Sequence, residues 1–249
     1  LRDNAFGGIF NEFLGLVRDH YFSEYGESSD QYRLTYGGYF MEPHVAECTL
    51  KRMLESASNL QLLMRTELVQ VTLRGGSVKE CRFLNRDTGE HVSIRHDVAI
   101  DATYEGDLAS AAGAAFRLAR EGRDQFDESF AGVIWYDWRY HRNQVLPESA
   151  GEPSDTIQAN CFRVTLTDDP ATRIPIPRPA SYRDFEVEYR CVIDDFHRGR
   201  VRFLRELLWL NTLPNRKYCL NGHIEALTSC DLAGLSTHWV LGDWATRED

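Results

Sequence analysis

The 249-residue sequence lacks the glycine motifs by which phosphate-binding folds are usually recognised. A dinucleotide fold places GxGxxG between a strand and a helix, because bare glycine backbone must approach the pyrophosphate. Neither that motif nor GxxxxGK[ST] occurs, and the pairs Gly7-Gly8 and Gly75-Gly76 have the wrong spacing. The residues alone therefore give no support for phosphate binding.

Paired cysteines and long apolar runs are also missing. The absence of any CxxC argues against a zinc cluster and a dense disulfide scaffold, so we expect no metal. Buried free thiols are the preferred interpretation, with one or two disulfides as the alternative for an exported protein. No apolar run reaches the roughly 18 residues that cross a bilayer, so we expect a soluble chain, cytoplasmic or exported. The six cysteines are Cys48, Cys81, Cys161, Cys191, Cys219 and Cys230.

Positive charge is in short supply as well. Lys and Arg number 28 against 38 Asp and Glu, which gives a formal net charge of -10. A phosphate backbone would be repelled on average, which argues against nucleic acid as a partner. With 43% hydrophobic residues the core is not limiting, and the length predicts one large domain or two smaller ones.

Two helices are predicted near the amino terminus. Apolar residues from Phe6 to Tyr21 recur with the helical period and form one continuous face. Pro43 suits the first position of a second helix that runs to about Ser58. The residues expected to form the core face of this second helix are Leu50, Met53, Leu54 and Ala57.

A change to the period of a strand follows, and it predicts a small antiparallel meander that feeds a buried strand. Further along, six of the eight prolines fall between Pro147 and Pro179 and predict extended chain, whereas residues 183–211 have a helical period that Gly199 breaks. The predicted strands are Leu60–Met64, Glu67–Arg74, Val78–Leu84, the segment of Val92 and Ile94, and the buried Asp97–Ile100.

The turn DATYEGD, residues 101–107, comes directly after the predicted buried strand and before a helix of small residues. Asp101, Glu105 and Asp107 would lie at the carboxyl end of the strand, where α/β folds keep their ligands. In the alternative interpretation Asp107 caps the helix and Glu105 is solvated. Carboxylates at a helix amino end also argue against direct contact with phosphate.

Two polar segments are candidates for recognising a substrate. Their amide and cationic side chains stand beside turn signals and aromatic residues, which suits binding of hydroxyl or carboxylate groups. Alternatively the asparagines form turns and the cations form ordinary ion pairs, and the sequence leaves both interpretations open. The candidates are Asn160 and Arg163 in QANCFR, and Asn215, Arg216, Lys217 and Asn221 in LPNRKYCLNGH.

Several segments in order resemble the FAD-dependent oxidoreductase family, which includes members labelled xanthan-lyase-like. They are YFMEPHVAECTLKRML, AIDATYEGDLASAAGA, REGRDQFDESFAG, QANCFRVTLTDDPATRIPIPRPASY and LPNRKYCLNGH. The resemblance implies a glutathione-reductase-like α/β flavoprotein with FAD as cofactor. Residues 1–120 would be the remainder of a three-layer Rossmann-like FAD domain, and residues 121–249 an α+β substrate domain. The family's glycine loop and its carboxyl-terminal flavin segment are expected to lie outside this chain.

By position, the resemblance assigns cofactor contacts to Leu68, Asp101, Ala102 and Thr103. It implies hydride transfer between a polar, possibly glycan-derived substrate and the flavin. The expected substrate residues are Asn160, Arg163, Asn215 and Lys217, and no catalytic base is identified.

Two alternatives come from other classes. Glu105, Asp107 and the aromatic stretch Trp135–Tyr140 would suit a carbohydrate-processing hydrolase or lyase, because paired carboxylates can protonate a glycosidic oxygen. The missing phosphate loop would suit an inactive, truncated binding module.

Overall fold

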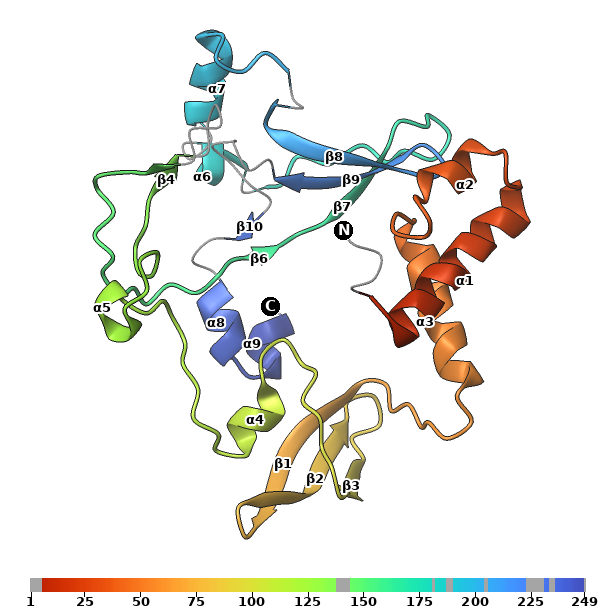
Figure 1. Ribbon diagram of the computed structural model, residues 1–249, viewed down its shortest axis with the longest axis vertical. Helices are drawn as coiled ribbons and strands as arrows, with labels where there is room; N and C mark the ends of the chain where they lie inside the picture. The colour runs from red at the N-terminus through yellow and green to blue at the C-terminus, as the bar shows by residue number, and fades with distance from the viewer. Residues whose placement is uncertain are drawn as a thin grey trace. The chain divides into compact units, whose positions relative to one another are not determined.

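The computed structural model describes residues 6–137, 144–180, 182–186, 190–203, 206–222, 231–232 and 236–248. Two compact units interleave along the chain (Figure 1). Unit 1 comprises residues 1–59, 136–144 and 160–232, and unit 2 comprises residues 60–135, 145–159 and 233–249. The division at residue 120 into a cofactor domain and a substrate domain stays a prediction.

The core of unit 1 lies between α1 (Gly8–Tyr25) and α3 (Pro43–Ser56). The apolar face predicted for the first helix is confirmed at Leu14, Val17 and Tyr21, which are buried, but Ile9 and Phe10 near its start are 75% and 41% exposed. Val17 and Tyr21 pack with Val45 of α3, and three partly buried side chains surround them. The short helix α2 (Asp30–Leu34) connects the two, with the Ser29 hydroxyl as its amino-terminal cap. The three surrounding side chains are Phe13, Tyr32 and Met41.

The second predicted helix begins at Pro43 as expected, but its predicted core face is only partly right, because Met53 and Ala57 are half-buried whereas Leu50 and Leu54 are exposed. Val45 and Thr49 are buried, whereas Leu50 is 50% exposed and Leu54 is 36% exposed. The buried pair is spaced i, i+4 on the side that meets α1, so the real stripe is displaced from the most apolar one. Hydrophobicity alone did not identify which side faces α1.

Glycine allows the chain to cross closely over α1. Gly38 has a φ of +101°, and a Cβ added there would lie 2.2 Å from the backbone oxygen of Leu14. A side chain at this position would therefore clash with the helix backbone as well as strain its own.

Unit 1 also contains an antiparallel sheet in the order β7-β9-β8, formed by β7 (Val164–Thr167), β8 (Leu208–Leu213) and β9 (Lys217–Gly222). The short strands β6 (Asn160–Cys161) and β10 (Asp231–Leu232) form a separate pair. The helices α6 (Tyr182–Glu186) and α7 (Arg190–His197) stop just before Gly199, as the sequence predicts. The predicted helical continuation to residue 211 is wrong, because that apolar run pairs with β9, and short apolar runs fit both periods.

Unit 2 contains the predicted meander. β1 (Thr66–Arg74), β2 (Ser77–Asn85) and β3 (His91–Arg95) form an antiparallel sheet in that order, with Gly75 and Gly76 at positive φ in the first turn. A register shift between Leu68 and Gln70 places a bulge at Val69. β1 is an edge strand of this described sheet.

Two predicted strands of unit 2 are wrong. Residues 60–64 and 97–100 are not strands, and Val98 and Ile100 are 75% and 83% exposed. A strand needs a neighbour to satisfy its backbone groups, and neither segment pairs with another in the part of the chain that the structure describes. Apolar content alone was not sufficient.

The remaining elements are short. The predicted helix of small residues is only α4 (Asp107–Ala111), because Gly113 at φ +73° follows it. Further along lie α5 (Arg123–Phe126), the paired strands β4 (Tyr136–Asp137) and β5 (Gln144–Val145), α8 (Ser236–Leu241) and α9 (Trp244–Glu248). The mixture of helices and strands fits an α/β protein, although no parallel Rossmann sheet is described among these strands.

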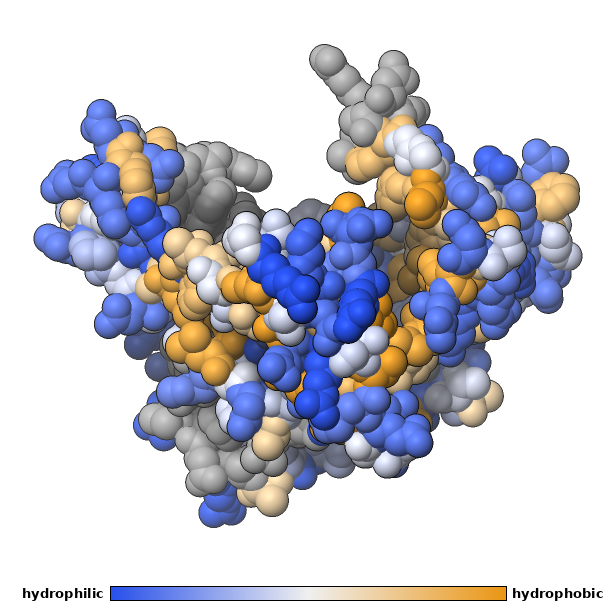
Figure 2. Space-filling view, turned by 90° about the horizontal axis from the view of Figure 1, so that it is seen from below, coloured by the Kyte–Doolittle hydropathy of each residue, from blue (hydrophilic) through white to orange (hydrophobic). Residues whose placement is uncertain are grey.

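The surface mixes hydrophobic and hydrophilic residues, as the face in Figure 2 shows. Large apolar side chains such as Ile9 and Val98 are each 75% exposed. Among the residues that the structure describes, none of the helices has the length and apolar character needed to span a membrane.

Candidate functional site

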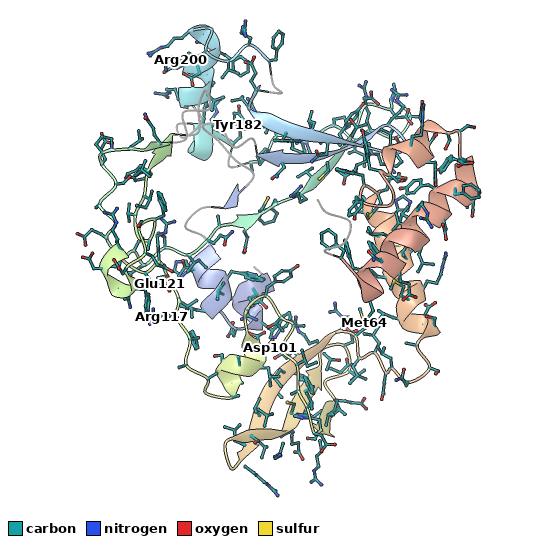
Figure 3. The ribbon with its side chains drawn as sticks, viewed as in Figure 1. Met64, Asp101, Arg117, Glu121, Tyr182 and Arg200 are labelled. Carbon is teal, nitrogen blue, oxygen red and sulfur yellow. The ribbon has the colours of Figure 1, made fainter. Side chains whose placement is uncertain are left out.

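The DATYEGD turn is held by its own side chains. Asp101 Oδ1 accepts hydrogen bonds from the backbone N–H and the hydroxyl of Thr103, at 3.0 and 2.7 Å. Thr103 Oγ1 in turn accepts from the N–H groups of Gly106 and Asp107 at 2.9 and 3.1 Å. Asp101 Oδ2 reaches the N–H of Ala109 inside α4 at 2.9 Å. Figure 3 shows Asp101 in the segment that leads to α4.

The alternative in which Asp107 caps its own helix is therefore wrong. Gly106 is the N-cap residue and makes no side-chain bond, and it is Asp101 that accepts from the first turn of α4. These bonds, first that from Ala109 and then that from the Thr103 hydroxyl, lower the pKa of Asp101. Asp107 has a different partner, because its two oxygens accept from Nη1 and Nη2 of Arg247, both at 2.9 Å.

Arg247 connects three helices of unit 2. Its side chain is only 9% exposed, and besides Asp107 of α4 it donates to the carbonyl oxygens of Trp239 and Val240 in α8, both at 3.1 Å. The guanidinium lies 5.6 Å from the ring centre of Trp239 and 5.9 Å from that of Trp244. The hydrogen bond to Asp107 is the main cause that raises the pKa of Arg247. A bidentate, mostly buried pair of this kind fixes both position and orientation.

These elements surround a cavity of about 660 Å³ within unit 2, referred to below as the β1–α4 cavity. Its walls come from β1, from the DATYEGD turn with α4, from residues 116–118, and from the α8–α9 pair. Of the four predicted cofactor contacts, Leu68 lines it, whereas Asp101, Ala102 and Thr103 do not, and Asp101 and Thr103 instead hold the turn by hydrogen bonds. The lining residues are Glu67, Leu68, Val69, Glu105, Gly106, Asp107, Ala109, Ser110, Ala111, Phe116, Arg117, Leu118, Val240, Leu241, Gly242, Asp243, Trp244 and Arg247.

The charges of this cavity are unsuited to phosphate. Four carboxylates line it against two guanidinium groups, and both arginines are already engaged. Arg247 binds Asp107, and Arg117 lies 3.6 Å from Glu121 and 4.2 Å from the ring centre of Phe126. Figure 3 labels Arg117 and Glu121 beside α5. An added anion would meet net negative charge.

A neutral, hydrogen-bonding ring system fits the same walls. Leu68 and Val69 of the edge strand β1 line the cavity, at the register shift that interrupts the regular pairing with β2. Phe116 and Trp244 add aromatic surface, and the Glu105 carboxylate makes no hydrogen bond or ion pair within the described residues. The adenosine end of a dinucleotide has this chemistry, whereas its pyrophosphate does not.

A second polar cluster, in unit 1, has Glu42 at its centre. This side chain is 2% exposed, and its Oε2 accepts from the Tyr21 hydroxyl at 3.0 Å and from Asn215 Nδ2 at 2.7 Å. Lys217 Nζ binds the other oxygen, and Asn215 also donates to the Tyr25 hydroxyl at 3.0 Å. Burial alone would raise the pKa of Glu42, but hydrogen bonds from Lys217, Asn215 and Tyr21 outweigh it and lower the pKa.

A family model described as FAD dependent oxidoreductase matches residues 1–248. The chain belongs to the FAD-dependent oxidoreductase family. It is therefore an oxidoreductase whose cofactor is FAD, as the resemblance implied. No curated protein and no solved structure matches the chain.

The four predicted substrate residues of this FAD-dependent oxidoreductase all lie in unit 1, and two of them belong to the Glu42 cluster. Arg163 donates to Cys219 Sγ at 3.7 Å, and Asn160 is in β6, whereas Asn215 and Lys217 converge on Glu42. Arg216 pairs with Asp168 at 2.8 Å. The roles of these residues in substrate binding stay predictions. Glu42 was not identified from the sequence, although an acidic residue between aromatic residues and Pro43, in YFMEPH, is an unusual candidate for burial.

Neither a disulfide nor a metal-ligand cluster is present in the part of the chain that the structure describes. Within the described ranges, Cys48, Cys81, Cys161 and Cys219 form no disulfide, and Cys81 alone of these is buried, with a pKa that burial raises. Cys191 has no described side chain and Cys230 lies outside the described residues. No group of three or more metal-ligating side chains occurs in those ranges.

Proposed function

We propose that this chain contributes the nucleotide-binding cavity and the substrate side of an FAD-dependent oxidoreductase that transfers hydride between a carbon of a polar, hydroxylated or glycan-derived substrate and the flavin. The β1–α4 cavity is the single observation that carries the proposal. FAD supplies the hydride acceptor or donor, so the side chains of the protein need only bind, orient and shield. The Rossmann-like layers and the cofactor and substrate domains divided at residue 120 belong to the same proposal.

In this proposal the cavity takes the adenosine end of FAD. The backbone of Leu68 and Val69 would hydrogen-bond the purine edge, Phe116 and Trp244 would pack against its ring, and the Glu105 carboxylate would accept from ribose hydroxyls. Asp101 and Thr103 act indirectly by holding the turn that carries Glu105. The pyrophosphate would lie outside, because the net charge of the cavity disfavours it.

On the substrate side, Asn160 and Arg163 remain the proposed contacts to hydroxyl or carboxylate groups. Asn215 and Lys217 are bound to Glu42, so they would support the substrate pocket through the turn between β8 and β9. No residue is assigned as a general base.

Asp107 does not favour the hydrolase or lyase alternative. Both of its carboxylate oxygens accept hydrogen bonds from Arg247, which leaves Glu105 without a free carboxylate partner to share acid and base roles. Of the aromatic stretch Trp135–Tyr140, residues 138–140 lie outside the described residues.

The test is a titration of the protein with FAD, adenosine and 2′,3′-dideoxyadenosine, followed through tryptophan fluorescence. We expect FAD and adenosine to bind, and the dideoxy compound to bind roughly tenfold more weakly because it cannot donate to Glu105. Glu105→Gln should reduce that discrimination, whereas Glu148→Gln, an exposed change outside the cavity, should preserve it. A protein that takes up neither FAD nor adenosine would refute the proposal.

A further inference from the structure

Three backbone segments of unit 2, at residues 120–123, at Gly132 and at residues 151–154, lie in direct contact. Arg120 and Ser154 exchange backbone hydrogen bonds of 2.9 and 3.1 Å, and the N–H of Arg123 donates to the carbonyl of Gly151 at 2.8 Å. A Cβ on Gly132 would lie only 2.2 Å from that same carbonyl oxygen. The segments leave beside them a cavity of about 510 Å³ between residues 122–125 and 150–153, which shares no lining residue with the β1–α4 cavity.

Arg123 lines this second cavity with an unpaired charge. Its guanidinium lies against Gly151, where an added Cβ would be 2.9 Å from both Cζ and Nε. Within the described residues its side chain has no hydrogen-bond or ion-pair partner, and its Nε is buried and unsatisfied. The Nε is enclosed by the chain, so a ligand in the cavity would meet the guanidinium through Nη1 and Nη2, which are accessible and have no partner within the described residues.

The neighbouring side chains restrict what that ligand is. A guanidinium binds a carboxylate through two parallel hydrogen bonds. Asp124 and Glu152 line the same cavity but form no ion pair with Arg123, so they remain as acceptors. A dianionic phosphate would be repelled by both of them. A carboxylate without a neighbouring donor would pair with Arg123 but would leave Asp124 and Glu152 without a hydrogen-bond donor.

We propose that this cavity binds a small carboxylic acid that carries a hydroxyl or ammonium group beside its carboxylate. The carboxylate pairs with Arg123, and the adjacent donor hydrogen-bonds to Asp124 or Glu152. The shared chemistry is that of a 2-hydroxy acid or an amino acid. This site is independent of the cofactor cavity, and its failure would leave the proposed FAD site unaffected.

Calorimetric titration of the full 249-residue protein with glycolate, glycine, acetate and inorganic phosphate tests the site. Either glycolate or glycine should bind at least tenfold more tightly than acetate, and which of the two binds identifies a hydroxy acid or an amino acid. Arg123→Gln should abolish this binding. Arg74→Gln, the same change of charge at an exposed position in the β1–β2 hairpin, should leave it unchanged. Circular dichroism of the variants checks that both are folded.

Two further measurements extend the test, and the first of them uses the unaltered protein. Modification of Arg123 by phenylglyoxal, located by mass spectrometry, should slow when glycolate or glycine is present, and Glu152→Gln should reduce the preference over acetate. Equal binding of acetate and phosphate, binding that survives Arg123→Gln, or no binding of any of the four probes would each overturn the proposal.

Discussion

At the residue scale, Asp101 organises the turn that carries Glu105. One oxygen of its carboxylate accepts from Thr103 and the other accepts from the N–H of Ala109. A single side chain therefore spans the turn and the start of α4. Side-chain acceptors for the free N–H groups at a helix start typically contribute about 1 kcal/mol. The turn therefore depends on its first residue, Asp101, more than on its last, Asp107.

Asp101→Ala should lower the free energy of unfolding by about 1 kcal/mol, because two backbone N–H groups lose their acceptor. The lowered pKa of Asp101 means that its contribution is present above the unfolded pKa of about 3.9 and is lost as the pH falls through the folded pKa. Urea unfolding at pH 7 and in the acid range measures both effects. Asp97→Ala, at an exposed position without a described partner, is the control. A difference between Asp101→Ala and wild type that persists undiminished in strong acid would contradict this account.

Glu42 presents a different case, because its charge is almost completely removed from water. Three donors surround the carboxylate, and Lys217 supplies the opposite charge from a side chain that is 31% exposed. Such pairs add little compared with apolar replacements of equal size, yet removing one partner leaves the other unpaired.

We therefore expect Glu42→Ala to destabilise unit 1 by about 3 kcal/mol. The double variant Glu42→Leu with Lys217→Met should lose less than the sum of the two single changes, since no charge is then left alone. Thermal or urea unfolding of the four proteins in this cycle gives the coupling energy. Glu47→Ala, which breaks the exposed pair with Lys51, should be silent. Simple additivity in the cycle would argue against a coupled pair.

At the scale of elements, α8 and α9 act together on α4. Short helices of five or six residues are not stable alone, so their positions come from tertiary contacts. Arg247 supplies these contacts by binding Asp107 together with two carbonyl oxygens at the end of α8. Cationic groups are favourable at a helix carboxyl end, which adds to the attachment.

Arg247→Gln should release α8 and α9 from α4, cost about 2 kcal/mol of stability and weaken FAD binding roughly tenfold. Arg247 holds one wall of the β1–α4 cavity, and a neutral glutamine cannot replace its ion pair with Asp107. Tryptophan emission should shift to longer wavelength, because Trp239 and Trp244 lose the packed guanidinium. Arg95→Gln, which removes an exposed pair with Glu80, should change neither property. Unaltered FAD affinity in a folded Arg247→Gln protein would show that FAD binding does not depend on the attachment of α8 and α9 to α4.

At the scale of the whole molecule, net charge governs how an anionic cofactor arrives. The chain carries a net charge of -10, and the cavity walls are acidic too. FAD is also negative, so screening should help the two meet. We expect the association rate of FAD to rise with added salt over the range in which the Debye length falls from about 30 Å to about 10 Å. Stopped-flow fluorescence at low and moderate salt measures this, and a fall in rate would indicate a local basic entry path.

The sequence was sufficient for elements whose causes are local. The hairpin at Gly75-Gly76 and the carboxyl-terminal part of the α1 face follow from turn chemistry and period, and both are confirmed. It failed at residues 97–100, because a strand depends on neighbours that no local pattern specifies. The bond from Arg247 to Asp107 and that from Lys217 to Glu42 cross 140 and 175 residues, so only the folded chain brings them together. Leu68 lines the β1–α4 cavity, and its role as a cofactor contact, which came from a family resemblance and not from periodicity, stays a prediction.

The glycines around the Arg123 cavity have an evolutionary consequence. Gly122, Gly132 and Gly151 each stand where a Cβ would meet neighbouring chain at 2.9 Å or less. At Gly132 the obstacle is rigid backbone and φ is +80°, so even alanine is excluded on two counts. Homologues that keep this backbone arrangement should retain the three glycines, at intervals of ten and nineteen residues, even where the residues between them change. That spacing would let distant homologues be recognised after ordinary similarity has been lost.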